Sequence, residues 1–132
     1  MIETMPLVPN PEAVLIGRLQ ASRWKGGLRC PRCGQKECSI HARGKDGRRK
    51  LRCAGCGRTF TDLTSTPLAH THLPLTLWAA AARMMVAGRP TCSELSLRLK
   101  VKLATAWRVR KILTLALNDA DLRQVLVNED PV

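Results

Sequence analysis

Apolar residues recur at helical spacing in three stretches of the chain. The first stretch follows Asn10-Pro11-Glu12, where a capping Asn, a Pro suited to the first turn and an acid predict a helix start. The helix should end near Trp24 and Gly26-Gly27, because consecutive glycines favour leaving the helical conformation. Its apolar stripe consists of Ala13, Leu15, Ile16 and Leu19. We therefore expect residues 1–27 to form an N-terminal helical segment.

The second stretch begins after Pro74 and is followed by a capping signal. Gly88 and Pro90 should end this helix. Its apolar face consists of Leu77, Trp78, Ala81, Ala82, Met85 and Val86. Thr91-Cys92-Ser93-Glu94 has the capping-box pattern, in which the Thr hydroxyl and the Glu carboxylate each accept from a backbone N–H at the helix start. A short helix with apolar residues at Leu95, Leu97 and Leu99 should follow.

The third stretch predicts a longer helix after Lys100-Val101-Lys102, running to about Asn118. Its apolar stripe consists of Leu103, Ala106, Val109, Leu113, Ala116 and Leu117. Beyond Asn118 the chain becomes acidic, and Leu122 with Val125 allows one more helical turn. We therefore expect a helical bundle over residues 68–118 and an acidic tail over residues 119–132.

Between residues 28 and 67 the helical spacing is absent, and short segments alternate with glycines. Residues 39–43 and 48–53 have the pattern of two strands joined at Gly44-Lys45-Asp46-Gly47, since Asp-Gly is a strong hairpin signal. Residues 59–63 predict a third strand. The expected fold class is therefore small α+β: an N-terminal helix, a module of three short strands and a C-terminal helical bundle.

Two Cys-x-x-Cys turns in this module indicate a metal site. Cys30 and Cys33 form the first turn, and Cys53 and Cys56 form the second. The two-residue gap lets both sulfur atoms of a turn face one ion, and a hairpin can bring the turns together. A glycine after each turn relieves crowding where backbone amides point at the thiolates. This spacing predicts a zinc ribbon with one Zn²⁺ held by four thiolates.

Other interpretations of the cysteines and histidines stay open at this stage. Disulfides are disfavoured because nothing indicates export, and rubredoxin-like iron or a redox dithiol is disfavoured by the scarcity of aromatics. Cys38 is a fifth candidate ligand, although its spacing fits no paired turn, and Cys92 should pack at a helix start. His70 and His72 could hold a second metal, but ordinary surface or phosphate contacts are favoured for them and for His41.

The formal net charge of +12 favours a polyanionic partner, with nucleic acid as the first candidate. Between Arg18 and Arg58 the only acids are Glu37 and Asp46, and between Arg83 and Lys111 the only acid is Glu94. No apolar run is long enough to cross a membrane. The N-terminal residues lack the pattern of a signal peptide, so we expect a cytoplasmic, nucleoid-associated protein.

Two basic segments are candidates for contact with DNA. The hairpin can bind phosphates by counterion release, although a solvated charged surface is the alternative. Its candidate residues are Arg43, Lys45, Arg48, Arg49, Lys50, Arg52 and Arg58. Residues 91–118 resemble a helix-turn-helix, whose second helix lies in the major groove, with a plain basic bundle as the alternative.

In this second segment, Lys102, Thr105 and Arg108 should lie opposite the apolar stripe and contact bases, and Arg110 and Lys111 should hold phosphates. Lys100 stands where a helix-turn-helix usually has Gly, and Lys102 where a capping Ser or Thr is usual. We expect both lysines to lie at the DNA surface. Trp107 is interpreted as a core residue rather than a platform for base stacking.

Taken in order, these features resemble the N-terminal region of bacterial insertion-sequence transposases, a zinc ribbon followed by a helical DNA-binding segment. The resemblance covers roughly residues 10–117. It is carried by Arg23-Trp24, Cys30-Pro31-Arg32-Cys33-Gly34, Leu51-Arg52-Cys53, Cys56-Gly57-Arg58-Thr59-Phe60-Thr61, Thr64-Ser65-Thr66-Pro67, Leu73-Pro74-Leu75, Trp78 and Thr105-Ala106-Trp107-Arg108. In that family the region recognises transposon-end DNA, and a nuclease domain with an acidic metal-binding triad follows.

We expect DNA binding without nuclease activity. The acids of the chain are few and scattered, and no spaced carboxylates suit two-metal phosphoryl transfer. The expected function is zinc-dependent, sequence-selective binding of double-stranded DNA by a regulator, a targeting subunit or a transposase remnant, with a homodimer or larger complex possible. The alternative is a zinc-ribbon adaptor that docks on RNA or on a larger complex such as a polymerase or ribosome.

Overall fold

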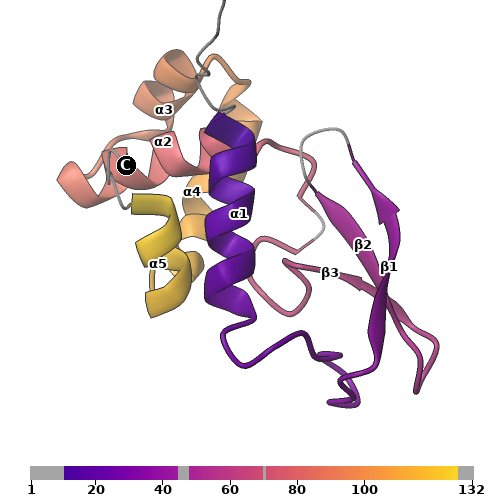
Figure 1. Cartoon of the computed structure of the whole chain (residues 1–132). Coiled ribbons are helices and arrows are strands. Elements are labelled where there is room, and N and C mark those ends of the chain that lie inside the picture. The colour runs from indigo at the N-terminus through magenta and orange to yellow at the C-terminus, as the bar shows by residue number, and fades with distance from the viewer. Residues whose placement is uncertain (1–10, 45–47, 70, 128–132) are drawn as a thin grey trace, which may run out of the picture.

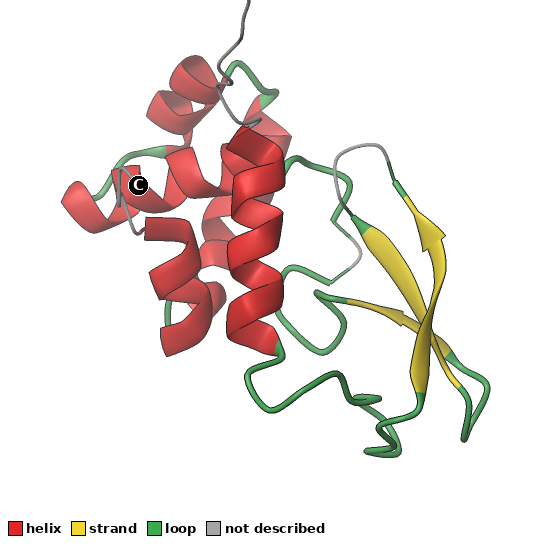
Figure 2. Ribbon diagram, in the orientation of Figure 1, coloured by secondary structure: helices red, strands yellow, loops and turns green. Residues whose placement is uncertain are grey.

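The computed structural model describes residues 11–44, 48–69 and 71–127. Five helices gather on one side of the molecule and a small sheet lies on the other (Figures 1 and 2). In chain order the elements are α1 (Pro11–Arg23), β1 (Cys38–Arg43), β2 (Arg49–Cys53), β3 (Thr59–Thr61), α2 (Leu75–Ala87), α3 (Cys92–Leu99), α4 (Leu103–Ala116) and α5 (Ala120–Val127). The predicted α+β class is therefore confirmed.

The helical core joins the two ends of the described chain. Leu15, Ile16 and Leu19 of α1 belong to the same buried cluster as Trp78 of α2 and Leu126 of α5. Trp78 is 2% exposed, so α2 is a core helix. In chain order, the strands therefore lie between α1 and the helices with which α1 packs, and in space they lie to one side of those helices (Figure 1).

The segment from residue 120 forms the two-turn helix α5, longer than the single turn expected. Leu122, Val125 and Leu126 are buried against α1 and α2, while the acid Asp121 stays exposed and pairs with Lys25. The segment expected as an acidic tail thus contributes apolar side chains to the core through residue 127.

One correction in α1 involves a charged residue. Ala13, expected in the apolar stripe, is exposed, while Glu12 is buried. The Glu12 carboxylate accepts hydrogen bonds from the backbone N–H groups of Leu75 at 2.7 Å and Thr76 at 2.9 Å. Because the N-cap of α2 is Pro74, whose side chain makes no capping hydrogen bond, Glu12 satisfies the first N–H groups of α2 from another helix.

The sheet is antiparallel in the order β1-β2-β3, with a register irregularity between Ile40 and Ala42. On β2, Leu51 and Cys53 face inward with Phe60 of β3, and they form a separate small core with Cys30. The third strand ends at Thr61 rather than at residue 63. It ends there because the Thr61 hydroxyl accepts from the Leu63 N–H and the Thr64 hydroxyl accepts from the Thr61 N–H, which turns the chain.

Besides Ala13, three larger residues assigned to apolar stripes are exposed. They are Val86 of α2, Leu97 of α3 and Leu103 of α4. Each lies at a helix end or on a short helix, where the neighbouring helix does not cover the predicted face. No helix of the described residues is long and apolar enough to cross a membrane.

Candidate zinc centre and nucleic-acid interface

The four predicted ligands converge into one cluster. The sulfur atoms of Cys30 and Cys56 are 3.7 Å apart, those of Cys33 and Cys53 are 3.4 Å apart, and all four lie within 4.8 Å of one another. A tetrahedral Zn²⁺ with Zn–S bonds of about 2.3 Å holds its sulfur ligands about 3.8 Å apart. A disulfide requires about 2.05 Å, so the disulfide alternative is wrong, and all six cysteines are free.

The two turns repeat the same backbone geometry. The N–H of Gly34 donates to the carbonyl of Cys30, and the N–H of Gly57 donates to that of Cys53, both at 2.9 Å. Both glycines have positive φ, 78° and 75°, a conformation that other residues adopt only with strain. A Cβ at either position would meet no atom within 4 Å, so the glycines are required for the positive φ of the turn rather than for the predicted relief of crowding.

Backbone N–H groups stabilise two of the sulfur atoms as thiolates. Those of Cys33 and Arg32 lower the pKa of Cys30 to about 6, and that of Cys56 lowers the pKa of Cys53. Although the Gln35 N–H favours the Cys33 thiolate, hydrogen bonding with the other thiols, first with Cys53, raises the pKa of Cys33 to about 12. Four thiolates this close would repel one another, so all four can be deprotonated together only with a cation among them. The cluster therefore fits Zn²⁺.

The other candidate ligands lie apart from this centre. The thiol of Cys38 donates to the carbonyl of Gln35 at 3.5 Å, and Cys92 is the first residue of α3, as expected. His41 and His72 are exposed, and among the described residues they belong to no cluster that could hold a metal. His70 lies outside the described residues.

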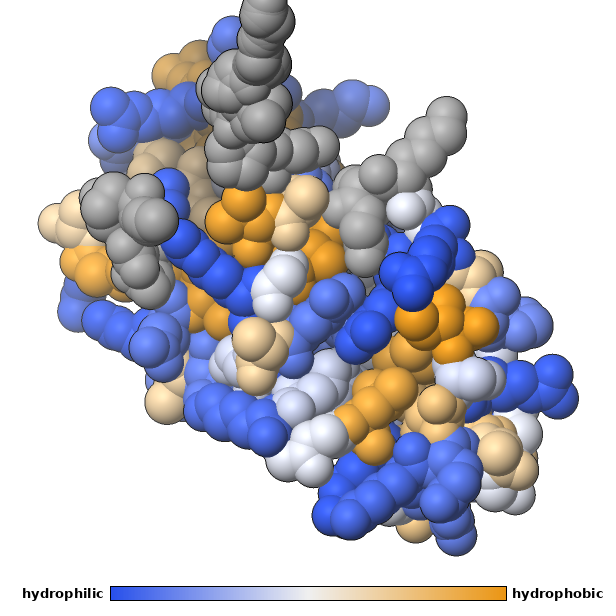
Figure 3. All heavy atoms as spheres, in the orientation of Figure 1, coloured by the Kyte–Doolittle hydropathy of each residue, from blue (hydrophilic) through white to orange (hydrophobic). Residues whose placement is uncertain are grey.

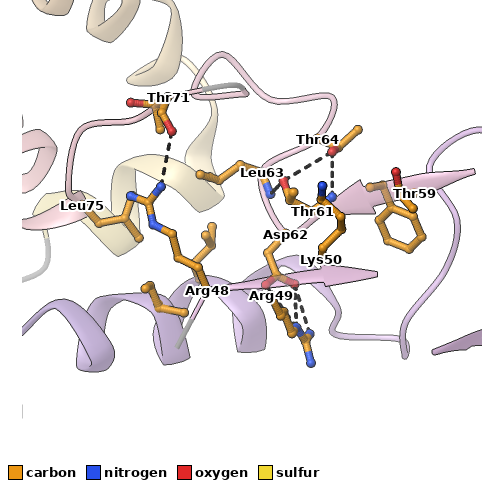
Figure 4. Close-up of a pocket in the computed structure, with 13 residues that line it drawn as sticks. Arg48, Arg49, Lys50, Thr59, Thr61, Asp62, Leu63, Thr64, Thr71 and Leu75 are labelled. Atoms are coloured by element: carbon orange, nitrogen blue, oxygen red, sulfur yellow. Dashed lines mark hydrogen bonds and ion pairs between the residues drawn. The ribbon is translucent and has the colours of Figure 1, made fainter. Parts of the chain in front are cut away.

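Two of the predicted DNA contacts hold the ribbon against the helices. Arg49 makes a bidentate ion pair with Asp62, whose carboxylate also accepts from Trp24 Nε1 at 2.7 Å and Gln20 Nε2 at 3.1 Å. Asp62 is 5% exposed. Figure 4 shows Arg49 and Asp62 facing each other beside the cavity between the sheet and α1, whose volume is about 330 Å³.

Arg48 makes a second link, from the start of β2 to the helices. Its guanidinium lies 3.6 Å from the Glu12 carboxylate and donates to the carbonyls of Thr71 and Leu73. Neither link was anticipated, and the only sequence signal for Asp62 is that it is an acid next to a basic segment. Since both arginines have partners inside the protein, substituting them would disturb folding as well as any contact with DNA.

The outward face of the sheet presents other basic residues. Lys50 and Arg52 alternate with the buried Leu51 and are exposed on the central strand. Their neighbours across the strands on this face are small: Ala42, Ser39, Thr61 and Thr59. Hydrophilic residues dominate the ribbon surface in the space-filling view, with small hydrophobic patches between them (Figure 3). Arg43 and Arg58 are also exposed, and Lys45 lies outside the described residues.

Helices α3 and α4 pack together across the three-residue turn Lys100–Lys102. The capping box is confirmed, since Thr91 and Glu94 accept from each other's backbone N–H. Lys100 has the left-handed conformation, with φ 57° and ψ 47°. Lys102 is the N-cap of α4 and makes no side-chain capping bond. Both deviations noted in the sequence are therefore present.

The exposed face of α4 differs from the prediction. Trp107, expected in the core, is 58% exposed, and its ring lies 5.1 Å from Lys111 Nζ. Thr105 is half-buried rather than opposite the buried stripe. The predicted residues that are exposed at this end of the molecule are Lys100, Lys102, Arg108, Arg110 and Lys111. The misassignment of Trp107 arose because a large apolar residue is usually buried, whereas its helical position places it on the outer side.

Comparisons with known proteins agree with this geometry. Residues 12–59 match the family described as the transposase zinc-ribbon domain. A protein of Halobacterium salinarum, described as an uncharacterized protein in transposable element ISH50, is 28% identical over 86 residues. That alignment covers 65% of this chain but 29% of the relative, so the chain spans less than a third of the relative's length. No solved structure matches the chain significantly. The resemblance is confirmed for the N-terminal part: residues 12–59 match a transposase zinc-ribbon domain, and the four cysteines provide a site for one Zn²⁺.

Proposed function

We propose that the protein is a zinc-dependent, sequence-selective binder of double-stranded DNA. The observation that carries this proposal is the outer surface of the helix-turn-helix. From Leu95 to Asn118 the chain contains no acid, and Lys102, Arg108 and Lys111 are exposed around the first turns of α4. In a helix-turn-helix those turns lie in the major groove, so the basic residues would meet the phosphates and base edges of a duplex.

We propose that the ribbon contacts the phosphate backbone of the DNA. Lys50 and Arg52 project from the outward face of β2 among small side chains, which leaves room for a phosphate strand to approach. Contacts of lysine and arginine with phosphates add affinity without sequence information. Zinc supports this function indirectly, because Cys53 belongs to the same strand as Lys50 and Arg52.

We assign no nuclease activity to this region and propose a role as a regulator or DNA-targeting part, acting in the cytoplasm at the nucleoid. Of the acids that the structure describes, Glu12 and Asp62 are buried and bound by backbone or side-chain donors of the fold. In the described part of the chain, the four cysteines are the cluster that could hold a metal, and no carboxylates form one. Two-metal phosphoryl transfer needs such carboxylates.

The experiment is a selection of random duplex DNA with the zinc-loaded protein at near-physiological salt, followed by affinity measurements on the enriched site. We expect an enriched motif. If Arg108 contacts a base, Arg108→Ala should reduce the affinity for that motif by roughly tenfold or more. Arg52→Ala should weaken binding to all duplexes similarly and reduce the salt slope by about one. Arg123→Ala on α5 is the control, since it removes the same charge beside Asp119 and Asp121.

The proposal fails if no duplex is enriched, or if Arg108→Ala and Arg123→Ala behave alike on the selected site. A protein-docking adaptor is the second candidate, and the exposure of Leu97 at 79% and Leu115 at 61% favours it. In that case binding to nucleic acid would be weak for every polymer. Leu97→Ser would then reduce assembly with a protein partner while leaving DNA affinity unchanged.

A further inference from the structure

The outer side of α4 carries large apolar side chains. Ala106, Val109 and Leu113 are fully buried and define the inner side of this helix. At 100° per residue, Trp107 lies about 130° around the helix from their mean direction, and Leu103, one turn earlier, lies about 90° from it on the same flank. Trp107 is 58% exposed and Leu103 is 56% exposed. Two large apolar residues therefore stand at the start of the helix that we assign to the major groove.

The surroundings of these residues are cationic. Lys102 precedes Leu103, Arg108 follows Trp107, and the Lys111 ammonium lies over the Trp107 ring. Trp107 also lines a surface hollow of about 580 Å³ with Arg89, Arg110 and Lys111, and none of the described residues that line it is an acid. An apolar patch with only cations around it complements a polyanion better than it complements a protein surface of mixed charge.

The major groove of DNA offers one apolar group to such a patch. Each thymine presents its 5-methyl group there, and apolar side chains recognise it by van der Waals contact. Residues in the first turns of the second helix of a helix-turn-helix are those that reach base edges. Leu103 is the first residue of α4 and Trp107 follows one turn later, so both are in position to meet neighbouring base pairs.

We propose that Leu103 and Trp107 are specificity-determining residues that contact thymine methyl groups in the major groove. The inference rests on the proposed DNA binding and adds the chemical group of the base that the protein recognises. Lys102, Arg108 and Lys111 then hold the phosphates and flanking bases while the apolar pair distinguishes thymine from cytosine. The cation over Trp107 stiffens the indole at the helix surface before DNA arrives.

The test replaces single thymines of the selected duplex by deoxyuridine, which deletes only the methyl group. With the full zinc-loaded chain, one or two positions should lose about threefold to fivefold in affinity, the value expected for one buried methyl group. In Trp107→Ala or Leu103→Ala, replacement at the matching position should have no further effect. Trp107→Phe should keep part of the sensitivity, and Arg123→Ala all of it. Circular dichroism checks folding, which these exposed positions should not disturb.

Each outcome supports or overturns a separate claim. If a duplex motif is bound but no deoxyuridine position weakens binding, the methyl contact is overturned while the proposed function stands. If the sensitivity persists in both alanine variants, other residues make the contact and the inference is overturned. If Trp107→Ala instead disrupts association with a protein or a second copy while DNA affinity is unchanged, the patch is a protein interface. If no duplex is bound at all, the proposed function fails.

Discussion

The ribbon and the helical bundle are held together by different forces. The bundle buries apolar residues from α1, α2, α3, α4 and α5 in one cluster, and Trp78 lies within it. The buried core of the ribbon is much smaller and consists of Cys30, Leu51, Cys53 and Phe60, with Trp24 packed against it. Two of these four buried residues are metal ligands. Burial of apolar surface can therefore stabilise the bundle, whereas the ribbon depends on its metal.

The contact between the two regions is partly polar. Leu63, just after β3, is buried in the helical core, and the ring of Trp24 packs edge-on against Phe60. The polar part joins Asp62, which is paired with Arg49, to Gln20 of α1, and it joins Arg48 to Glu12, which caps α2. Basic residues that serve this contact are thereby separated from those left for a partner, Lys50 and Arg52. A run of charge in a sequence can thus contain both structural and surface residues, and within β2 strand alternation separates Arg49 from Lys50 and Arg52.

The largest effect should follow from removal of zinc. Chelation or Cys53→Ser should unfold the ribbon while the helices persist, because apparent binding energies of structural zinc reach about 10–16 kcal/mol. Zinc content, far-UV circular dichroism and limited proteolysis between residues 28 and 67 measure this. Cys92→Ser, a change outside the cluster, should keep one zinc per chain. Complete loss of helical signal on chelation would show that the bundle also depends on zinc.

The next effect should come from the polar contact between the regions. Asp62→Ala leaves the largely buried Arg49 and Trp24 Nε1 without their acceptor, and we expect a loss of about 3 kcal/mol in the free energy of unfolding. Asp121→Ala is the matched control, because its ion pair with Lys25 is exposed and should contribute less than about 1 kcal/mol. Urea unfolding compares them, and equal losses would contradict the assigned role of Asp62.

A smaller effect, of opposite sign, is expected at the turn between α3 and α4. Lys100 adopts the left-handed conformation that costs non-glycine residues about 1–2 kcal/mol, so Lys100→Gly should stabilise the protein by about 1 kcal/mol. Lys102→Gln removes the same charge at φ −64° and should give no such gain. The shift in urea midpoint measures the difference. A gain for both variants would mean that charge repulsion, and not backbone strain, is relieved.

The smallest effect concerns the response of the capping box to low pH. The backbone N–H and then the side chain of Thr91 hold the pKa of Glu94 below its usual 4.5. The stability that this carboxylate contributes is therefore present above pH 4.5 and is lost as pH falls through its lowered value. Hydrogen exchange of the Glu94 backbone N–H reports on α3 alone, which matters because acid also displaces zinc from thiolates. Glu94→Gln should flatten that local pH profile, and an unchanged profile would contradict the assignment.

Local features were predicted because few neighbours decide them. Cys-x-x-Cys spacing, the glycines after each turn, the pairing of β1 with β2 and the capping box depend on residues close together in the chain. The left-handed Lys100, at a position where glycine is usual, belongs to the same class. The predicted Asp46-Gly47 turn lies outside the described residues. Errors occurred where a stripe assigned by spacing alone ended at a helix terminus, as for Leu103, or where residue type was used as evidence of burial, as for Trp107.

The sequence by itself determined the metal ligands, the number of strands and most helix limits, since these follow from spacing and backbone preference. Only the tertiary structure decided that α1 completes the helical core and that Glu12 caps a helix whose first residue lies 63 positions away. It also decided that Arg48 and Arg49 bind the protein itself, while Trp107 faces outward. Burial and ion pairing depend on which distant elements pack together, and spacing along the chain carries no record of that.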